Sequence, residues 1–282
     1  MLKPDLAPAL KNYPRMTAVK TISLLSLLAS VALWHTPARA DNSLARVLRQ
    51  NQLRVGVDAS IGAPYLFWNQ RTRSLDGFEW EIARELATQL KVDIRPVSSK
   101  WAEQPQQLRQ QKFDVIISTR EEGSLDRQLF REIPYYRTAQ RLLVRSTDRH
   151  IHSFRNLIGK RVGVMPGSGG SALVDTYNKN RGNAIRVFSS QELDRMVQQL
   201  QNRQLDALIL DEPLAVWTAR QNSNLRVAGQ PLLAIHLVVV TNQEDKSLHD
   251  AIDRALAEMR QNGKLEQILR RWQLWQTAPS LR

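Results

Sequence analysis

Residues 53–57 read LRVGV, and residues 160–164 read KRVGV. Two further segments repeat in the same order: DIRPVSS at 93–99 matches AIRVFSS at 184–190, and QQL at 106–108 matches QQL at 198–200, each QQL followed six residues later by an Asp. Short β-branched runs that alternate with longer polar and apolar segments are typical of βαβ units in a parallel sheet. The repeat therefore predicts two similar α/β lobes, with a crevice between them where a small ligand would bind.

A different kind of segment precedes the repeats. Residues 21–33 (TISLLSLLASVAL) form an apolar run, which follows Lys11, Arg15 and Lys20 and precedes Ala38-Arg39-Ala40. A basic start, a short apolar run and a small-x-small site are the features of a secretory signal peptide, and the run is shorter than the ~20 residues of a transmembrane helix. We expect residues 1–40 to be a cleaved signal peptide, with a membrane anchor as the alternative. Met16 is an alternative start to Met1.

Composition narrows the classes of partner. The chain has no Cys, which excludes disulfide bonds and also a lipid attached to a cysteine at the cleavage site. We therefore expect a freely exported periplasmic protein, with a secreted protein as the alternative. Lys and Arg number 40 against 27 Asp and Glu, a net charge of +13. The basic residues are scattered and not interleaved with aromatics, which favours a solvated surface over nucleic-acid binding. We expect a monomer with no nucleic-acid partner; attraction of an anionic ligand or a membrane partner is the alternative role for the charge.

The pattern of apolar residues predicts an order of elements. In the first repeat we expect strands at 53–57, 93–97 and 113–118 and helices at 78–90 and 101–111, and the second repeat runs from 157 to about 230. Apolar runs at 141–144 and 237–240 are predicted to cross between the repeats, and helices at 247–262 and 264–275 to pack on the first. The predicted fold class is α/β, with two similar doubly wound lobes, 41–142 plus 236–282 and 143–235, joined by a two-stranded hinge that permits rigid-body closure.

Short motifs follow one another along the rest of the chain. They are LRVGVD at 53–58, PYLF at 64–67, GFEWE at 77–81, Trp101 with Asp114, SLDR at 124–127, PYY at 134–136, LIGKR at 157–161, Gly167-Ser168, LDA at 205–207 with Asp211, and Leu256, Arg260, Gly263, Ile268 and Trp272. In this order they resemble the family 3 solute-binding proteins, periplasmic receptors that hand polar amino acids to ABC transporters. The resemblance covers nearly all of residues 50–275 and implies the type II periplasmic binding protein fold.

The resemblance implies a binding function rather than catalysis. We expect a small polar amino acid or a close analogue as ligand, a membrane ABC-transporter permease as partner, and neither a cofactor nor a metal. Two alternatives stay open on the same fold, a periplasmic dehydratase and a ligand-binding partner of a membrane sensor. The residues give catalysis little support, since His150-x-His152 is the only metal-like spacing and no Ser–His–Asp arrangement is evident.

The resemblance assigns one group of residues to the ligand carboxylate. Arg127 is implied to grip it, because a guanidinium offers a bidentate fork; an exposed surface arginine is the alternative. Gly167, Ser168 and Gly169 follow the strand at 162–165 and precede a helix, where backbone N–H groups make an anion site.

A second group would meet the rest of the ligand. Asp211 ends the third strand of the second repeat and is implied to bind the α-amino group, with a cap for the helix near Pro213 as the alternative. Asp58 is implied to face the ligand's side chain, which favours a basic or amide group over a second carboxylate. The remaining candidates carry an aromatic ring or a hydroxyl and are Tyr65, Trp101, Ser118 and Thr119.

Two loops depart from the family pattern. Residues 118–124 are longer than usual and carry Arg120, Glu121 and Glu122 in place of small hydroxyl residues. An Arg120 that pointed inward would reverse the preference set by Asp58. Ile61-Gly62 also replaces the aromatic that would cover the ligand. The sequence therefore leaves the ligand's identity open.

We predict that the exported protein begins at Asp41, because Ala38 and Ala40 are the only well-placed small-residue pair after the apolar run. Amino-terminal sequencing of the exported protein checks the cleavage site. Retention of residues 21–33 in the mature protein would contradict the prediction and favour a membrane anchor.

Overall fold

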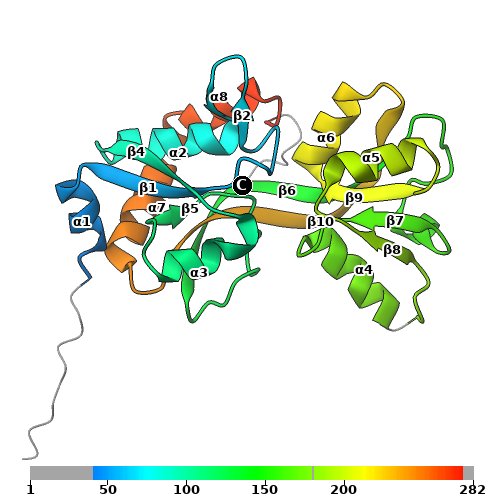
Figure 1. The fold of residues 1–282 in the computed structure, drawn as a ribbon, viewed down its shortest axis with the longest axis horizontal. Helices are drawn as coiled ribbons and strands as arrows, with labels where there is room; N and C mark the ends of the chain where they lie inside the picture. Colours follow the sequence, from blue (N-terminus) through cyan, green and yellow to red (C-terminus); the bar gives the residue numbers. More distant parts are fainter. Residues whose placement is uncertain (1–40, 180, 276–282) are drawn as a thin grey trace, which may run out of the picture. The chain divides into compact units, whose positions relative to one another are not determined.

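The computed structural model describes residues 41–179 and 181–275, so the predicted signal peptide lies outside the described part. The described residues form two α/β lobes, as the sequence repeat predicts (Figure 1). Within the described ranges, no helix is both long enough and apolar enough to cross a membrane.

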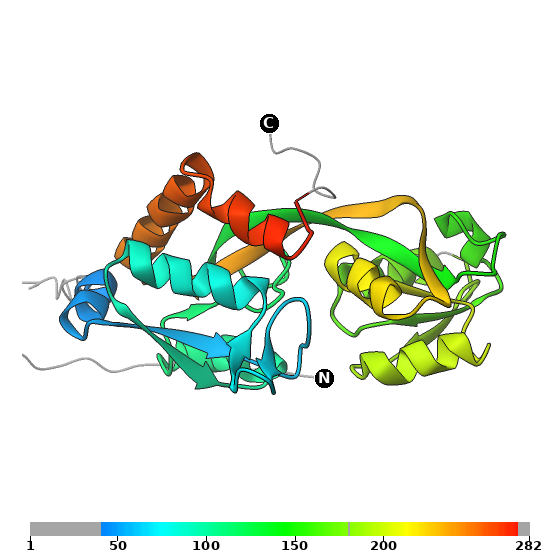
Figure 2. The ribbon, with the colours of Figure 1, turned by 90° about the horizontal axis from the view of Figure 1, so that it is seen from above.

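The first lobe is built on three parallel strands. β1 (Gln52–Val57) lies between β4 (Asp93–Ser98) and β5 (Val115–Ile116). Its helices are α1 (Ser43–Arg49), α2 (Phe78–Gln89), α3 (Gln104–Arg109), α7 (Lys246–Gln261) and α8 (Lys264–Arg271), with a hairpin of β2 (Phe67–Asn69) and β3 (Ser74–Asp76) before α2 and a 3-10 turn (Trp101–Glu103) before α3. Figure 2 shows α2 and α8 side by side on this lobe. Phe78, Ile82 and Leu86 are fully buried because their spacing of four places them on one face of α2.

The second lobe repeats this plan. β7 (Arg161–Val164) lies between β8 (Arg186–Ser189) and β9 (Ala207–Asp211), again with parallel pairing. Its helices are α4 (Gly169–Lys179), α5 (Leu193–Gln201) and α6 (Glu212–Gln221), and a 3-10 turn (Phe154–Leu157) precedes β7. The strands of both lobes form one sheet in the order β4-β1-β5-β10-β6-β9-β7-β8.

The same arginine–aspartate pair occurs at the same place in each lobe. In the first, Arg54 donates from its main-chain N to Asp114 Oδ2 (2.8 Å) and from Nη2 to Oδ1 (2.8 Å). In the second, Arg161 makes the same two bonds with Asp206, at 2.8 and 2.9 Å. A bidentate pair of this kind is strongly directional. The repeated sequence therefore specifies the same local structure twice, and it ties the first strand of each lobe to the residue before the third.

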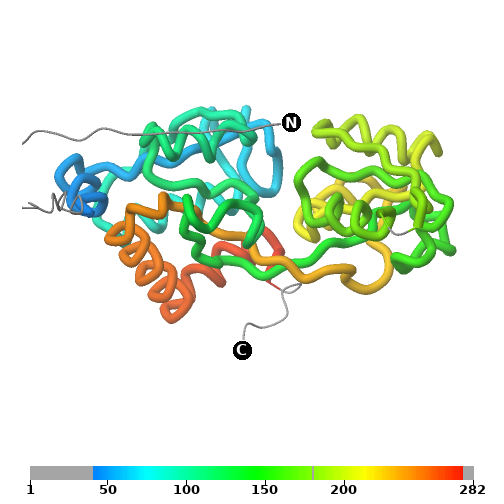
Figure 3. The backbone as a smooth tube through the Cα atoms, turned by 90° about the horizontal axis from the view of Figure 1, so that it is seen from below, coloured from blue at the N-terminus to red at the C-terminus, as the bar shows by residue number. Residues whose placement is uncertain are grey.

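Two long antiparallel strands connect the lobes. β6 (Phe130–Arg145) and β10 (Leu225–Asn242) run side by side from one lobe to the other (Figure 3). In the first lobe β10 pairs with β5 at Val240, and in the second β6 pairs with β9 along residues 140–143. Between these points, residues 136–139 pair with residues 234–237.

The structure corrects the position of the crossing. The predicted segments 141–144 and 237–240 both belong to the long strands, but 141–144 lies inside the second lobe and 237–240 inside the first. Their buried, apolar character marks the parts that enter a core, whereas the crossing itself carries Arg137 and other polar residues. Pro134, predicted to precede the strand, lies within β6, next to a register shift that accommodates a residue without an N–H. The predicted lobe limits at 142/143 and 235/236 fall within these strands and stay a prediction.

Several predicted boundaries also move. The helix expected at 101–111 is a 3-10 turn followed by the short α3, the strand expected at 113–118 pairs only over β5, and α8 ends at Arg271. α1 and the β2–β3 hairpin were not predicted, because each is short and gains its stability from packing rather than from its own pattern.

We predict that Gly77→Ala destabilises the first lobe severely. Gly77 precedes α2 with φ of 120°, and a Cβ there would lie 2.1 Å from the main-chain oxygen of Tyr65. We expect a loss of more than about 3 kcal/mol in the free energy of unfolding, because backbone strain and a backbone clash add. The matched control is Gly62→Ala, which also has positive φ (88°) but no atom within 4 Å of the new Cβ. It should lose only about 1 kcal/mol. Urea denaturation measures both, and equal losses would contradict the role of the clash.

Candidate functional site

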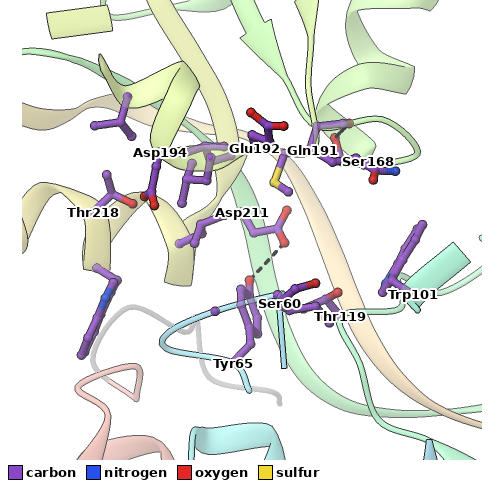
Figure 4. Close-up of a pocket in the computed structure, with 18 of the residues that line it drawn as sticks. Ser60, Tyr65, Trp101, Thr119, Ser168, Gln191, Glu192, Asp194, Asp211 and Thr218 are labelled. Atoms are coloured by element: carbon purple, nitrogen blue, oxygen red, sulfur yellow. Dashed lines mark hydrogen bonds between the residues drawn. The ribbon is translucent and has the colours of Figure 1, made fainter. Parts of the chain in front are cut away.

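A cavity of about 1220 Å³ lies between the two lobes. Its walls come from the loops that follow parallel strands of each lobe, where ligands of open α/β sheets bind. The cavity brings together seven of the ten residues that the sequence predicts for the site: Asp58, Tyr65, Trp101, Thr119, Gly167, Ser168 and Asp211. Figure 4 labels five of them, Tyr65, Trp101, Thr119, Ser168 and Asp211.

Asp211 ends β9 and is partly exposed to this cavity. Its Oδ2 accepts a hydrogen bond from Tyr65 Oη in the other lobe (3.0 Å), and its Oδ1 accepts one from Gln140 Nε2 (2.7 Å). Desolvation raises the pKa of Asp211, against the lowering effect of these two bonds. Although Asp211 precedes α6, its side chain makes no capping bond to that helix. Its carboxylate is directed to the cavity and to Tyr65, as Figure 4 shows.

Glu121 places a second carboxylate beside Asp211. Its Oε1 accepts hydrogen bonds from the main-chain N of Gly169 (2.8 Å) and from Gln140 Nε2 (3.3 Å). Desolvation and the neighbouring charge of Asp211 together raise the pKa of Glu121 to about 7, although the bond from Gly169 lowers it. The start of α4, predicted as an anion site, is therefore already bonded to a carboxylate of the chain itself. The insertion at 120–122 was visible in the sequence, but not the direction of this side chain.

Glu79 is a third carboxylate, fully buried behind Thr119. Its Oε1 accepts hydrogen bonds from the main-chain N of Thr119 (2.7 Å) and from Tyr135 Oη (2.5 Å). Burial raises the pKa of Glu79 to about 7, although these two bonds and the positive charge of Arg120 lower it. The sequence gives no sign of this role, since a Glu in the first turn of a helix is usually a solvated dipole partner.

Trp101 forms the wall of the cavity next to the second lobe's glycine loop. Its main-chain N donates to Asp58 Oδ2 (2.7 Å), and its Nε1 donates to the carbonyl of Ser118 (3.0 Å). The guanidinium carbon of Arg120 lies 3.6 Å from the centre of the Trp101 ring, and Arg120 also donates to the carbonyl of Trp101. Burial lowers the pKa of Arg120 to about 10, against the effect of Glu79. Arg120 is buried against Trp101 and does not line the cavity.

Comparison of the sequence with known protein families identifies one family. The profile of the bacterial extracellular solute-binding proteins, family 3, matches residues 53–274. The chain belongs to this family. The predicted resemblance and fold class are thereby confirmed.

Individual relatives are distant. The chain is 26% identical over 166 residues to the L-cystine-binding protein TcyJ of Bacillus subtilis (strain 168), an alignment that spans 57% of this chain and 61% of that protein. It is 25% identical over 232 residues to the histidine-binding periplasmic protein of Escherichia coli (strain K12), spanning 78% and 86% of the two chains. A substrate-binding protein of an ABC uptake transporter from Streptococcus pneumoniae, solved with bound histidine, superposes with a TM-score of 0.74 at 19% identity, over 86% of this chain and 99% of that one. These relatives are named as binding proteins.

Three predicted site residues of this family 3 protein do not line the cavity. Ser118 is buried, where its Oγ accepts a hydrogen bond from Gln104 Nε2 (3.2 Å). Gly169 contributes its N–H to Glu121, as described above. Arg127 is exposed and lies outside the cavity, so the structure does not bring it together with Ser168 and Asp211.

The position of Arg127 follows from the path of its loop. Glu121 pairs with Leu237 of β10, and the main-chain N of Ser124 donates to the carbonyl of Glu121 (3.1 Å). The turn at 121–124 is thus held against the crossing strands, and residues 126–129 beyond it are exposed. The sequence analysis missed Glu79 and Gln140 and singled out Arg120 and Glu121 without their contacts, because all four act through residues distant in the chain.

Glu79 and Glu121 predict a loss of stability with rising pH. Both pKa values are raised from 4.5 to about 7, so the folded protein holds protons that the unfolded chain releases. The stabilisation by these protons is complete below about pH 4.5 and is lost as the pH rises through about 7. We expect the free energy of unfolding without ligand to fall by on the order of 2–3 kcal/mol per group between about pH 5 and pH 8. Urea denaturation at both values measures the fall.

The variant Glu79→Gln measures how much of this fall in unfolding free energy comes from Glu79. It keeps an acceptor for Thr119 and Tyr135 but carries no charge, so its unfolding free energy should fall less with pH than that of the wild type. Glu85→Gln, on the same helix but away from the cavity, should behave as wild type. An unchanged pH dependence in Glu79→Gln would contradict the assignment.

Proposed function

We propose that this chain is a periplasmic receptor that captures a small polar amino acid or a close analogue with a cationic group, and delivers it to a membrane ABC permease. The observation that carries the proposal is the pair of carboxylates, Asp211 and Glu121, which lie side by side in one cavity and accept hydrogen bonds from the same Gln140 amide. Neither has an ion-pair partner in the described part of the chain, and the groups that donate hydrogen bonds to them there are neutral. An ammonium or guanidinium group between them would gain two charge-assisted hydrogen bonds.

The proposal includes closure of the lobes as rigid bodies, 41–142 plus 236–282 against 143–235. Contacts between them occur on several sides of the cavity: Tyr65 with Asp211, Glu121 with Gly169, and the rings of Trp217 and Trp272, whose centres are 6.0 Å apart. A ligand that touches both walls favours the closed form by its differential affinity for that form. The two crossing strands supply the hinge.

Thermal unfolding with a panel of amino acids, amines and small organic acids tests the function. A ligand at 100 times its Kd adds about 2.7 kcal/mol to the free energy of unfolding, which is a clear shift. We expect compounds with a cationic group to shift the transition and dicarboxylates not to shift it. Loss of a binding compound on incubation would instead favour an enzyme, and a panel without any shift would contradict the receptor assignment.

We predict that Asp211→Asn weakens binding of the ligand found in this panel by more than tenfold. The substitution preserves shape but removes the charge opposite a buried cation, and loss of such a contact costs about 2–5 kcal/mol. Arg127→Ala is the control: because Arg127 is exposed and outside the cavity, its affinity should stay within about twofold of wild type. Calorimetry on both variants, with circular dichroism to confirm folding, measures the effects. A large loss in Arg127→Ala would show that this arginine enters the site when ligand binds.

A further inference from the structure

Glu121 lies where the anionic group of a ligand would otherwise bind. The first N–H of α4, an 11-residue helix, is that of Gly169, and it donates to Glu121 Oε1 at 2.8 Å. The other oxygen, Oε2, lies 2.6 Å from the position that a Cβ on Gly169 would take. The absence of a side chain at Gly169 thus lets the carboxylate lie directly against the helix start. The chain itself supplies the anion that a helix N-terminus favours.

No basic side chain among the described residues is placed in the cavity to pair with the carboxylate of a ligand. Among the described residues that line the cavity, the cationic ones are Lys100 and Arg195, and both are exposed. The guanidinium of Arg195 lies over the ring of Phe188. Arg120 is stacked on Trp101, and Arg127 lies outside the cavity.

Carboxylates, by contrast, surround the cavity. Its described lining includes Asp58, Glu121, Glu192, Asp194 and Asp211. Glu79 lies behind this wall with its Oε2 buried and without a hydrogen-bond partner. A further carboxylate brought by a ligand would be repelled by these groups, whereas a cation would be attracted. In the described ranges no three His, Asp or Glu side chains are grouped closely enough to hold a metal ion, so the cation would be organic.

We propose that the ligand is a small organic amine or guanidine without a carboxylate, and that Glu121 takes the place of an amino acid's carboxylate at the start of α4. This inference rests on the proposed function and names the ligand class of the same site. The cationic group contacts Asp211 and Glu121 next to Tyr65, whose hydroxyl bonds to Asp211. Glu192 and Asp194, at the start of α5, suit a second cationic group at the far end of the ligand.

Matched pairs of compounds that differ only by a carboxylate test the proposal. The pairs are agmatine with arginine, cadaverine with lysine, and histamine with histidine. In at least one pair, calorimetry should give the amine at least tenfold higher affinity than its amino acid. An amino acid that binds as tightly as its amine in every pair that binds would overturn the inference and leave the proposed receptor function intact. Absence of binding by all six compounds, and by the wider panel, would overturn both.

Variants of Glu121 test its part in this preference. Glu121→Ala exposes the N–H of Gly169 and removes a negative charge, so the amine should lose affinity, the amino acid should gain it, and the ratio should change by tenfold or more. Glu121→Gln keeps an acceptor at Gly169 without the charge, so the amine should weaken without a gain for the amino acid. If Glu121→Ala does not fold, Glu121→Gln still tests whether the charge of Glu121 strengthens binding of the amine.

Glu122→Ala is the matched control. Glu122 is the next residue of the same loop, is exposed, and contacts His236 at 3.0 Å rather than lining the cavity. It should keep the wild-type ratio of affinities. An unchanged ratio in both Glu121 variants would overturn the assignment of Glu121, even if the amine binds more tightly than the amino acid.

Discussion

The geometry of the cleft depends on one amide, that of Gln140. This residue is fully buried on β6, directly opposite Asp211 in the ladder. Its Nε2 donates to Asp211 Oδ1 (2.7 Å) and to Glu121 Oε1 (3.3 Å), and these two carboxylates come from different lobes. The amide orients both carboxylates without neutralising either, because it carries a dipole and no charge. Desolvation raises the pKa of both carboxylates, and the Gln140 bond only partly offsets this for Asp211; no positive charge in the described part of the chain pairs with either group, so the cleft keeps its capacity to bind a cation.

The chain as a whole has the opposite charge. Its net charge is +13, yet the described lining of the cavity has five carboxylates and two exposed cations. Exposed charges are screened over about 10 Å at 0.1 M salt, whereas charges within a closed cleft are screened much less. The basic surface therefore says little about the ligand, and the few side chains around Asp211 decide which charge the cleft accepts.

Much of the fold was predictable because the two repeats carry the same information. The Arg54–Asp114 and Arg161–Asp206 pairs arise from the same spacing, and the ends of the predicted strands brought Asp58, Thr119 and Asp211 to one cavity. The crossing strands were underestimated because polar residues interrupt their apolar pattern where they pass between the lobes. A strand that carries Arg137 and Thr138 at its centre does not show the continuous apolar run that marks a core strand.

The sequence by itself determined the two lobes, the family and most of the residues around the cavity, because these follow from local periodicity and from motifs of short range. Only the tertiary structure decided that Glu121 reaches α4 and that Arg127 does not enter the cavity. Both depend on the bridge between Glu121 and Leu237, which sets the direction of the loop from 121 to 124. Hydrophobic patterns report which residues are buried within an element, but contact between residues 121 and 169 depends on the path of a loop between two lobes. That path is set by pairing with a strand more than one hundred residues away, which no local pattern encodes.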